Sequence, residues 1–91
     1  MTEAEVREAA QEALDSLPQW VQERMGDVAV VVEELHPDGI MGIYDPRGGI
    51  KRIVVFRDAN PSADEVRKTV WHEVGHFFGM GEEQLQELGY G

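Results

Sequence analysis

Apolar and polar residues alternate with the period of an α-helix at the start of the chain. Thr2 followed by Glu5 is the pattern of a capping box, which opens a helix. Apolar positions then recur every three or four residues as far as Leu17, with Glu, Gln and Arg between them. Pro18 ends this helix. A second short helix is predicted after it, closing near Gly26.

The middle of the chain changes to short β-branched segments that are separated by turns. Residues 28–32 are apolar and predict a central strand. The Pro-Asp-Gly sequence after His36 predicts a turn, in which His36 is a solvated residue and has no chemical role. Residues 40–44 and 50–57 predict two further strands, which the hairpin 45–49 connects.

The last third predicts a long amphipathic helix. Ser62 and Glu65 form a second capping box, so the helix should cover 63–78, with a short final helix at 82–88. At about 100° per residue, an apolar arc forms on one side of this helix. Its members are Val66, Val70, Val74 and Phe77. His72 and His76 fall outside that arc, so one face can pack while another carries polar chemistry.

This order of elements predicts an α+β fold in a single domain over 1–91. We expect a small, mostly antiparallel three-stranded sheet, packed with the N-terminal helices, the long helix and the short C-terminal helix. The large aromatic residues of the helices should belong to the core rather than to a substrate pocket. They are Trp20, Trp71, Phe77 and Phe78.

Charge and composition narrow the possible partners. The formal net charge is -10, from 18 acidic and 8 basic residues, which argues against nucleic acids and anionic membranes and favours cationic partners. The acidic N-terminus lacks the basic-then-apolar order of a signal peptide, so the simplest prediction is a cytoplasmic protein. We also expect a monomer. There is no cysteine, so any metal must be held by His, Asp or Glu.

The segment His72-Glu73-Val74-Gly75-His76 carries the chemistry. Two histidines four residues apart on a helix lie on one face, as two ligands of one zinc ion require. Glu73 lies about 100° further round the helix. From there it can take a proton from zinc-bound water that attacks a peptide carbonyl. This is the physical content of the His-Glu-x-x-His motif.

A third ligand should follow the helix. Gly79 can take the left-handed conformation that ends a helix, and Glu82 comes three residues later. This is metzincin spacing with a carboxylate where those enzymes usually place a histidine. Glu82 is therefore the preferred third ligand, and the adjacent Glu83 is the alternative. Tyr44 or Tyr90 could supply a phenol for an oxyanion, but no spacing places either near the metal.

The motif from His72 to Glu82, with the preceding Arg-Ile-Val-Val-Phe strand and Asn-Pro-Ser cap, resembles the minimal zincin-like metallopeptidases, a group of short bacterial proteins. The resemblance implies a reduced zincin fold. It also implies zinc ligands at His72, His76 and Glu82, with Glu73 as general base. Zincins add a substrate peptide as a strand to an exposed sheet edge, which the hairpin 45–49 would supply.

Three functions follow from these observations. The favoured one is a zinc-dependent peptidase that acts on a peptide or protein substrate. The alternative is a zinc-binding module without peptidase activity, in which the metal serves fold stability or partner binding. The third is a metal-free interaction domain. Two histidines and a carboxylate also suit divalent ions other than zinc.

Overall fold

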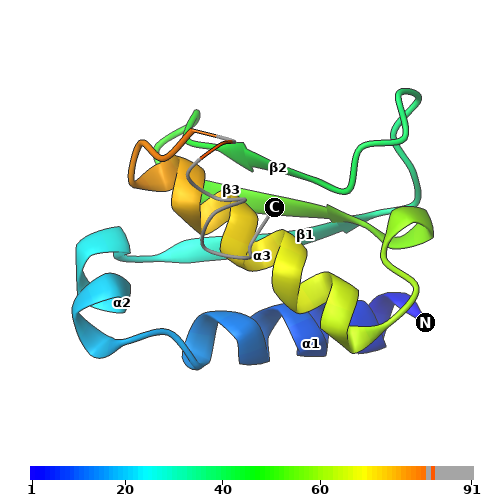
Figure 1. Cartoon of the computed structure of the whole chain (residues 1–91), viewed down its shortest axis with the longest axis horizontal. Helices are drawn as coiled ribbons and strands as arrows, with labels where there is room; N and C mark the ends of the chain where they lie inside the picture. The colour runs from blue at the N-terminus through cyan, green and yellow to red at the C-terminus, as the bar shows by residue number, and fades with distance from the viewer. Residues whose placement is uncertain (82, 84–91) are drawn as a thin grey trace.

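Two helices open the computed structural model, which describes residues 1–81 and 83 (Figure 1). Helix α1 spans Glu3–Asp15 and helix α2 spans Gln19–Met25. The Thr2 hydroxyl accepts a hydrogen bond from the Glu5 amide at 3.1 Å, and the Glu5 carboxylate accepts one from the Thr2 amide at 2.8 Å. The predicted capping box is thus confirmed, and it fixes the start of α1.

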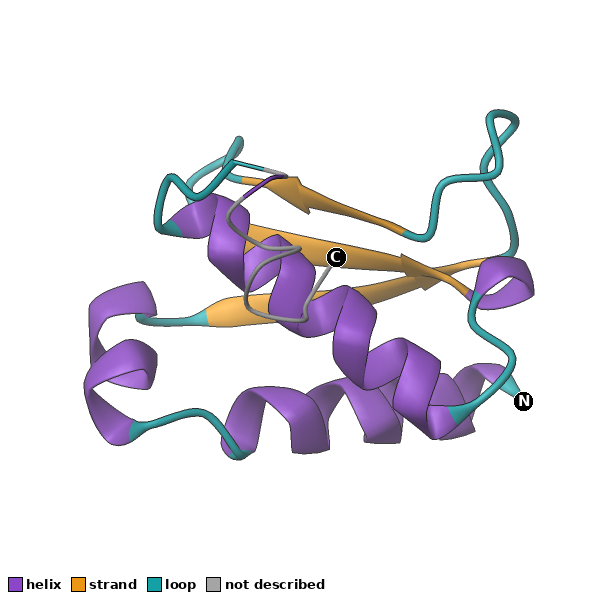
Figure 2. Cartoon of the chain, viewed as in Figure 1, coloured by secondary structure: helices purple, strands orange, loops and turns teal. Residues whose placement is uncertain are grey.

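A three-stranded sheet follows, with strands β1 (Val28–Glu33), β2 (Gly42–Asp45) and β3 (Lys51–Phe56) (Figure 2). Its order is β1-β3-β2. Strand β3 pairs with β1 in parallel and with β2 in antiparallel orientation. The prediction of a mostly antiparallel sheet was therefore wrong, because the sheet is mixed.

The physical reason lies in which strand takes the centre. Strand β3 has more buried residues than β1 or β2, which fits its position between the other two strands. The chain leaves β1 through the His36–Gly39 turn, where the Gly39 amide donates to the His36 carbonyl at 2.9 Å, and reaches the far edge before β2 begins. After the hairpin, β3 lies between β2 and β1.

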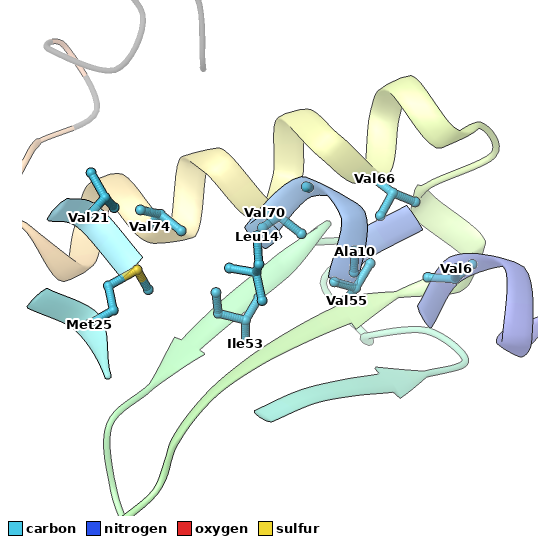
Figure 3. Packing of buried hydrophobic residues seen from close by; sticks show 11 residues of the cluster. Val6, Ala10, Leu14, Val21, Met25, Ile53, Val55, Val66, Val70 and Val74 are labelled. Carbon is cyan, nitrogen blue, oxygen red and sulfur yellow. The ribbon is translucent and has the colours of Figure 1, made fainter. Parts of the chain in front are cut away.

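Helix α3 (Ala63–Phe77) follows a 3-10 turn at Arg57–Ala59 and begins at Ser62, whose hydroxyl accepts a hydrogen bond from the Glu65 amide. Helices α1 and α3 pack together on one face of the sheet, and the core lies between them and the strands (Figure 3). Its fully buried members include Val6, Ala10, Ile53, Val55, Val66 and Val70.

The other face of the sheet carries no helix in the part of the chain that the structure describes (Figure 2). Side chains alternate between the faces of a strand, so Ile53 and Val55 point to the helices while Arg52 points away. The prediction of a core position was wrong for Trp20, which is 59% exposed and packs its ring edge on Phe78. The other three helical aromatics are half-buried against the core, in line with their prediction.

The final helix predicted at 82–88 lies, apart from Glu83, outside the described residues. Within 1–81 and 83, no helix combines the length and the apolar character that crossing a bilayer requires.

Candidate metal centre

The histidines of the motif lie on the last two turns of α3, away from its packing face. Val66, Val70 and Val74 are buried against the core, as the predicted apolar arc requires. His72 and His76 are half-buried instead. The helix therefore has one face that fixes its position and another that presents two imidazoles, which confirms the separation of the two faces that the sequence predicted.

Three potential ligand groups converge at this point. Nε2 of His72 and Nε2 of His76 are 3.1 Å apart. The Glu73 side chain completes the group, and the ligand atoms of all three residues lie within 4.8 Å of one another. Glu73 is buried, at 7% exposure, which is uncommon for a carboxylate and costly unless it has polar or charged neighbours. A small polar centre is thus built into the end of an otherwise apolar helix.

The spacing of the two nitrogens fits a tetrahedral metal ion. Zinc holds imidazole nitrogens at about 2.0–2.1 Å, which puts two ligands of a tetrahedron about 3.3 Å apart. The observed 3.1 Å between the two Nε2 atoms needs only a small adjustment to reach that separation. The donor set of two imidazoles near a carboxylate also suits zinc. This group could therefore hold a metal ion.

The orientation of His76 is set by the end of the helix. Gly79 has φ +78, and its amide donates to the His76 carbonyl while the Met80 amide donates to the Gly75 carbonyl. These two bonds form a Schellman motif, the common glycine-dependent helix end. The turn places the Met80 carbonyl oxygen 3.2 Å from Nδ1 of His76.

That contact fixes which ring nitrogen of His76 can bind a metal. A carbonyl oxygen only accepts hydrogen bonds, so Nδ1 of His76 must carry the proton and donate to Met80. Nε2 then keeps its lone pair, directed at Nε2 of His72. Backbone carbonyls commonly orient metal-binding histidines in this way.

Gly42, the first residue of β2, lies beside the candidate site. A Cβ atom at this position would lie 2.6 Å from Cγ2 of Thr69 and 3.5 Å from Cγ of Glu73. Only glycine allows α3 to approach the strand so closely. The stem of Glu73 therefore lies directly beside the start of β2, and the site adjoins one edge of the sheet.

With this geometry established, the relation to known sequences can be assigned. The sequence profile of a family described as zincin-like metallopeptidase matches residues 43–91. The chain belongs to this zincin-like metallopeptidase family. The matched segment includes α3, which carries His72, Glu73 and His76, together with β3 and all but the first residue of β2. No curated protein matched the chain.

The described residues do not test the predicted third ligand. Glu82 lies outside the described residues, and Glu83 is helical and exposed. The choice of Glu82 over Glu83 stays a prediction. Tyr90 also lies outside the described residues, whereas the ring of Tyr44 packs edge-on against Phe77 at 5.7 Å between centroids.

Sequence reasoning missed two supports of the site. The Met80 carbonyl was missed because a backbone atom leaves no residue signature, although Gly79 marked the turn that positions it. The close approach at Gly42 was also missed, and here a signal existed. An isolated glycine at a strand often marks the approach of another backbone or side chain.

Proposed function

We propose that this chain is a zinc-dependent peptidase in which His72 and His76 hold the metal ion and Glu73 is the general base. Zinc, when bound, supplies Lewis acidity, which makes a water molecule more acidic and polarises a carbonyl group. The observation that carries the proposal is the convergence of two Nε2 atoms at 3.1 Å beside a buried carboxylate. Glu82 is proposed as the third ligand.

The role of Glu73 follows from its position between the two histidines. It follows His72 directly in the helix, so its side chain leaves the helix in a different direction from the two imidazoles. At 7% exposure its carboxylate faces little bulk water. Its proposed role is to accept a proton from the attacking water and to deliver it to the amine that leaves.

The two edges of the sheet differ in a way that favours binding of a peptide beside β2. At the β1 edge, Arg7 reaches from α1 and donates to the Val30 carbonyl at 2.8 Å, which blocks pairing there. At the β2 edge, the Phe56 amide donates to the Met41 carbonyl. Opposite residues in an antiparallel ladder alternate between hydrogen-bonded and non-hydrogen-bonded pairs. Because Met41 and Phe56 form a hydrogen-bonded pair, the backbone groups of Gly42 and Tyr44 must face outwards.

These outward groups support strand addition as the mode of substrate binding. An extended peptide that pairs with Gly42 and Tyr44 would become a fourth strand of the sheet. Gly42 lies beside the Glu73 stem, and the Tyr44 ring contacts Phe77, which follows His76. A peptide at this edge would therefore pass next to the proposed metal and base.

The decisive experiment separates metal binding from hydrolysis. Protein purified without chelator or nickel resin should contain zinc and should cleave members of a degenerate peptide library, with the products identified by mass spectrometry. Glu73→Gln should keep its zinc content and lose hydrolysis. Glu8→Gln on the exposed face of α1 is the matched control and should retain both. Loss of zinc in Glu73→Gln would make Glu73 a ligand and overturn its proposed role.

The same preparation tests the alternative function. A wild-type chain that binds zinc, melts at a lower temperature after chelation and cleaves nothing is a zinc-stabilised module rather than a peptidase. A chain that neither contains nor takes up a metal refutes both proposals. For the third ligand, Glu82→Ala should weaken zinc binding and Glu83→Ala should not.

A further inference from the structure

Basic residues are concentrated at the β2–β3 hairpin of an otherwise acidic chain. The segment 39–57 holds half of the eight basic residues and only one of the eighteen acidic residues. Its basic members are Arg47, Lys51, Arg52 and Arg57, and its acidic member is Asp45. This segment includes the sheet edge that we propose as the substrate site.

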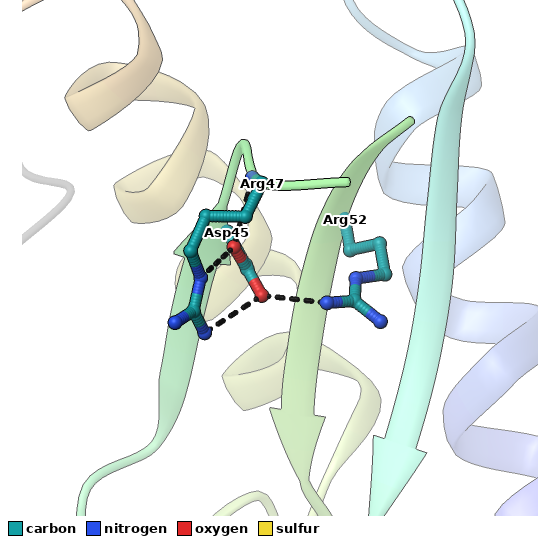
Figure 4. A network of polar contacts seen from close by, with 3 residues as sticks. All are labelled: Asp45, Arg47 and Arg52. Carbon is teal, nitrogen blue, oxygen red and sulfur yellow. Dashed lines mark hydrogen bonds and ion pairs between the residues drawn. The ribbon is translucent and has the colours of Figure 1, made fainter. Parts of the chain in front are cut away.

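Ion pairs leave part of this charge uncompensated. Arg57 pairs with Glu34 at the other end of β3. At the hairpin, the Asp45 carboxylate accepts hydrogen bonds from both Arg47 and Arg52, at 2.9 Å and 2.8 Å for the closest pairs (Figure 4). Two guanidinium groups therefore share one carboxylate, and within residues 1–81 and 83 the ion pairs of the hairpin leave a net positive charge. The Lys51 ammonium adds a second charge, 5.6 Å from the centre of the Phe77 ring.

Arg47 combines exposure with a fixed position. Its side chain is 85% exposed, yet Nε and Nη2 both donate to Asp45 and its backbone amide does so too. A guanidinium group that is already held in place loses less conformational freedom when it pairs with a further carboxylate. We name Arg47, Lys51 and Arg52 the hairpin cationic cluster.

The cluster lies within reach of a peptide bound at the β2 edge. Gly42 marks the position of Glu73, and Asp45 ends the strand three residues later. At about 3.4 Å per residue, that separation is about 10 Å along the strand. A peptide residue about three positions from the cleaved bond would therefore lie level with the cluster, with β2 between it and β3.

At this distance, nearby charges influence a bound peptide more than the net charge of the chain does. The chain carries -10 overall, which alone would favour basic peptides. At physiological salt, however, screening reduces electrostatic interactions beyond about 8 Å. A peptide beside the hairpin is therefore influenced mainly by the hairpin cationic cluster, and much less by the acidic face of α1.

We propose that the hairpin cationic cluster selects peptides that carry Asp or Glu about three positions from the cleaved bond, on the side towards the hairpin. This inference rests on the proposed peptidase function and on strand addition to β2. It names the class of substrate, an acidic peptide segment, and gives Lys51 and Arg52 a role in specificity.

The test compares charge-removing variants on one probe, a degenerate peptide library. With wild-type protein, cleaved peptides should be enriched in Asp and Glu at two neighbouring positions about three residues from the cut, because Lys51 and Arg52 are successive residues of β3 and lie on opposite faces of the sheet. Lys51→Gln and Arg52→Gln should each reduce the enrichment at one of these positions about threefold, and added NaCl should reduce it at both. Arg67→Gln is the matched control, because the Arg67 and Arg52 side chains are both 47% exposed and each pairs with an aspartate.

A second readout does not require turnover. Library peptides retained on the zinc-loaded Glu73→Gln chain should show the same acidic enrichment, and Lys51→Gln in that background should remove it. If wild-type protein cleaves nothing while acidic peptides are retained, the peptidase proposal fails, and only the binding of acidic peptides by the hairpin cationic cluster is supported. Enrichment of Lys or Arg, no charge preference, or an equal effect of Arg67→Gln would overturn the inference.

Discussion

Nδ1 of His76 donates to the carbonyl oxygen of Met80, across a turn that exists because Gly79 adopts φ +78. The glycine thus does more than end the helix. It brings a backbone acceptor to the imidazole and thereby leaves Nε2 available for the proposed metal ion. The helix end and the proposed ligand sphere form one structural unit.

Gly79→Ala should therefore weaken zinc binding. An L-residue in the left-handed region costs about 1–2 kcal/mol, and relief of that strain would move the Met80 carbonyl away from His76. Loss of such a supporting hydrogen bond typically lowers metal affinity about tenfold or more. Competition with a chelating dye measures the zinc affinity directly.

The hairpin supplies the matched control for this variant. Gly48 has φ +81, and a Cβ there would also meet no atom within 4 Å. Gly48→Ala should thus lose similar stability and keep its zinc affinity. Equal zinc affinities for the two variants would show that Met80 does not orient His76.

Local signals explain why α3 and the grouping of its two histidines could be predicted from sequence. The predicted helix over 63–78 differs by one residue from Ala63–Phe77, because Ser62 and Gly79 fix its ends through their own hydrogen bonds. Spacing along one helix likewise brings His72 and His76 together, whatever the rest of the chain does.

The pairing of the strands is a non-local property, and there the prediction failed. Alternation within β1 and β3 indicates which side chains face the core, but not which strand lies between the others. The exposure of Trp20 has a similar origin. Whether this ring is buried depends on where α2 packs against the end of α3. Among its described ring contacts, the Trp20 ring touches only the edge of Phe78 and the guanidinium of Arg24.

Gly42→Ala should force α3 away from β2. The new methyl group would lie 2.6 Å from Cγ2 of Thr69 and 3.0 Å from the Val54 carbonyl oxygen. Overpacking of this kind costs about 1–3 kcal/mol in the free energy of unfolding. Urea denaturation of the variant measures that loss.

A second substitution identifies the contact that is responsible. Thr69→Ser removes Cγ2, the nearest atom, and keeps the hydroxyl group. The double variant with Gly42→Ala should lose less free energy of unfolding than the sum of the losses in the two single variants. Strict additivity would mean that the Val54 carbonyl, and not Thr69, limits the approach.

The Thr69 hydroxyl connects the helix to the sheet through a buried amide. It donates to Oδ1 of Asn60 at 2.6 Å, and the Asn60 amide nitrogen donates to the carbonyls of Met41 and Phe56. Asn60 is fully buried, so Thr69→Val would leave its Oδ1 without this donor. We expect a loss of about 1–3 kcal/mol, measured by urea denaturation. Thr69→Ser keeps the donor, and a Val variant as stable as the Ser variant would contradict the prediction.

Asp45 predicts how the stability of the hairpin depends on pH. The hydrogen bonds from Arg47 hold the pKa of this carboxyl far below its ordinary value of about 3.9, and the bond from Arg52 lowers it further. Because the folded-state pKa is lowered, the stabilisation is complete above the unfolded pKa and is lost as the pH falls below about 4. Asp45→Asn cannot titrate, so the difference in urea midpoint between wild type and variant should be constant at pH 5–7 and shrink towards pH 3. A difference that stays constant over the whole range would show that the Asp45 ion pairs contribute nothing to folding.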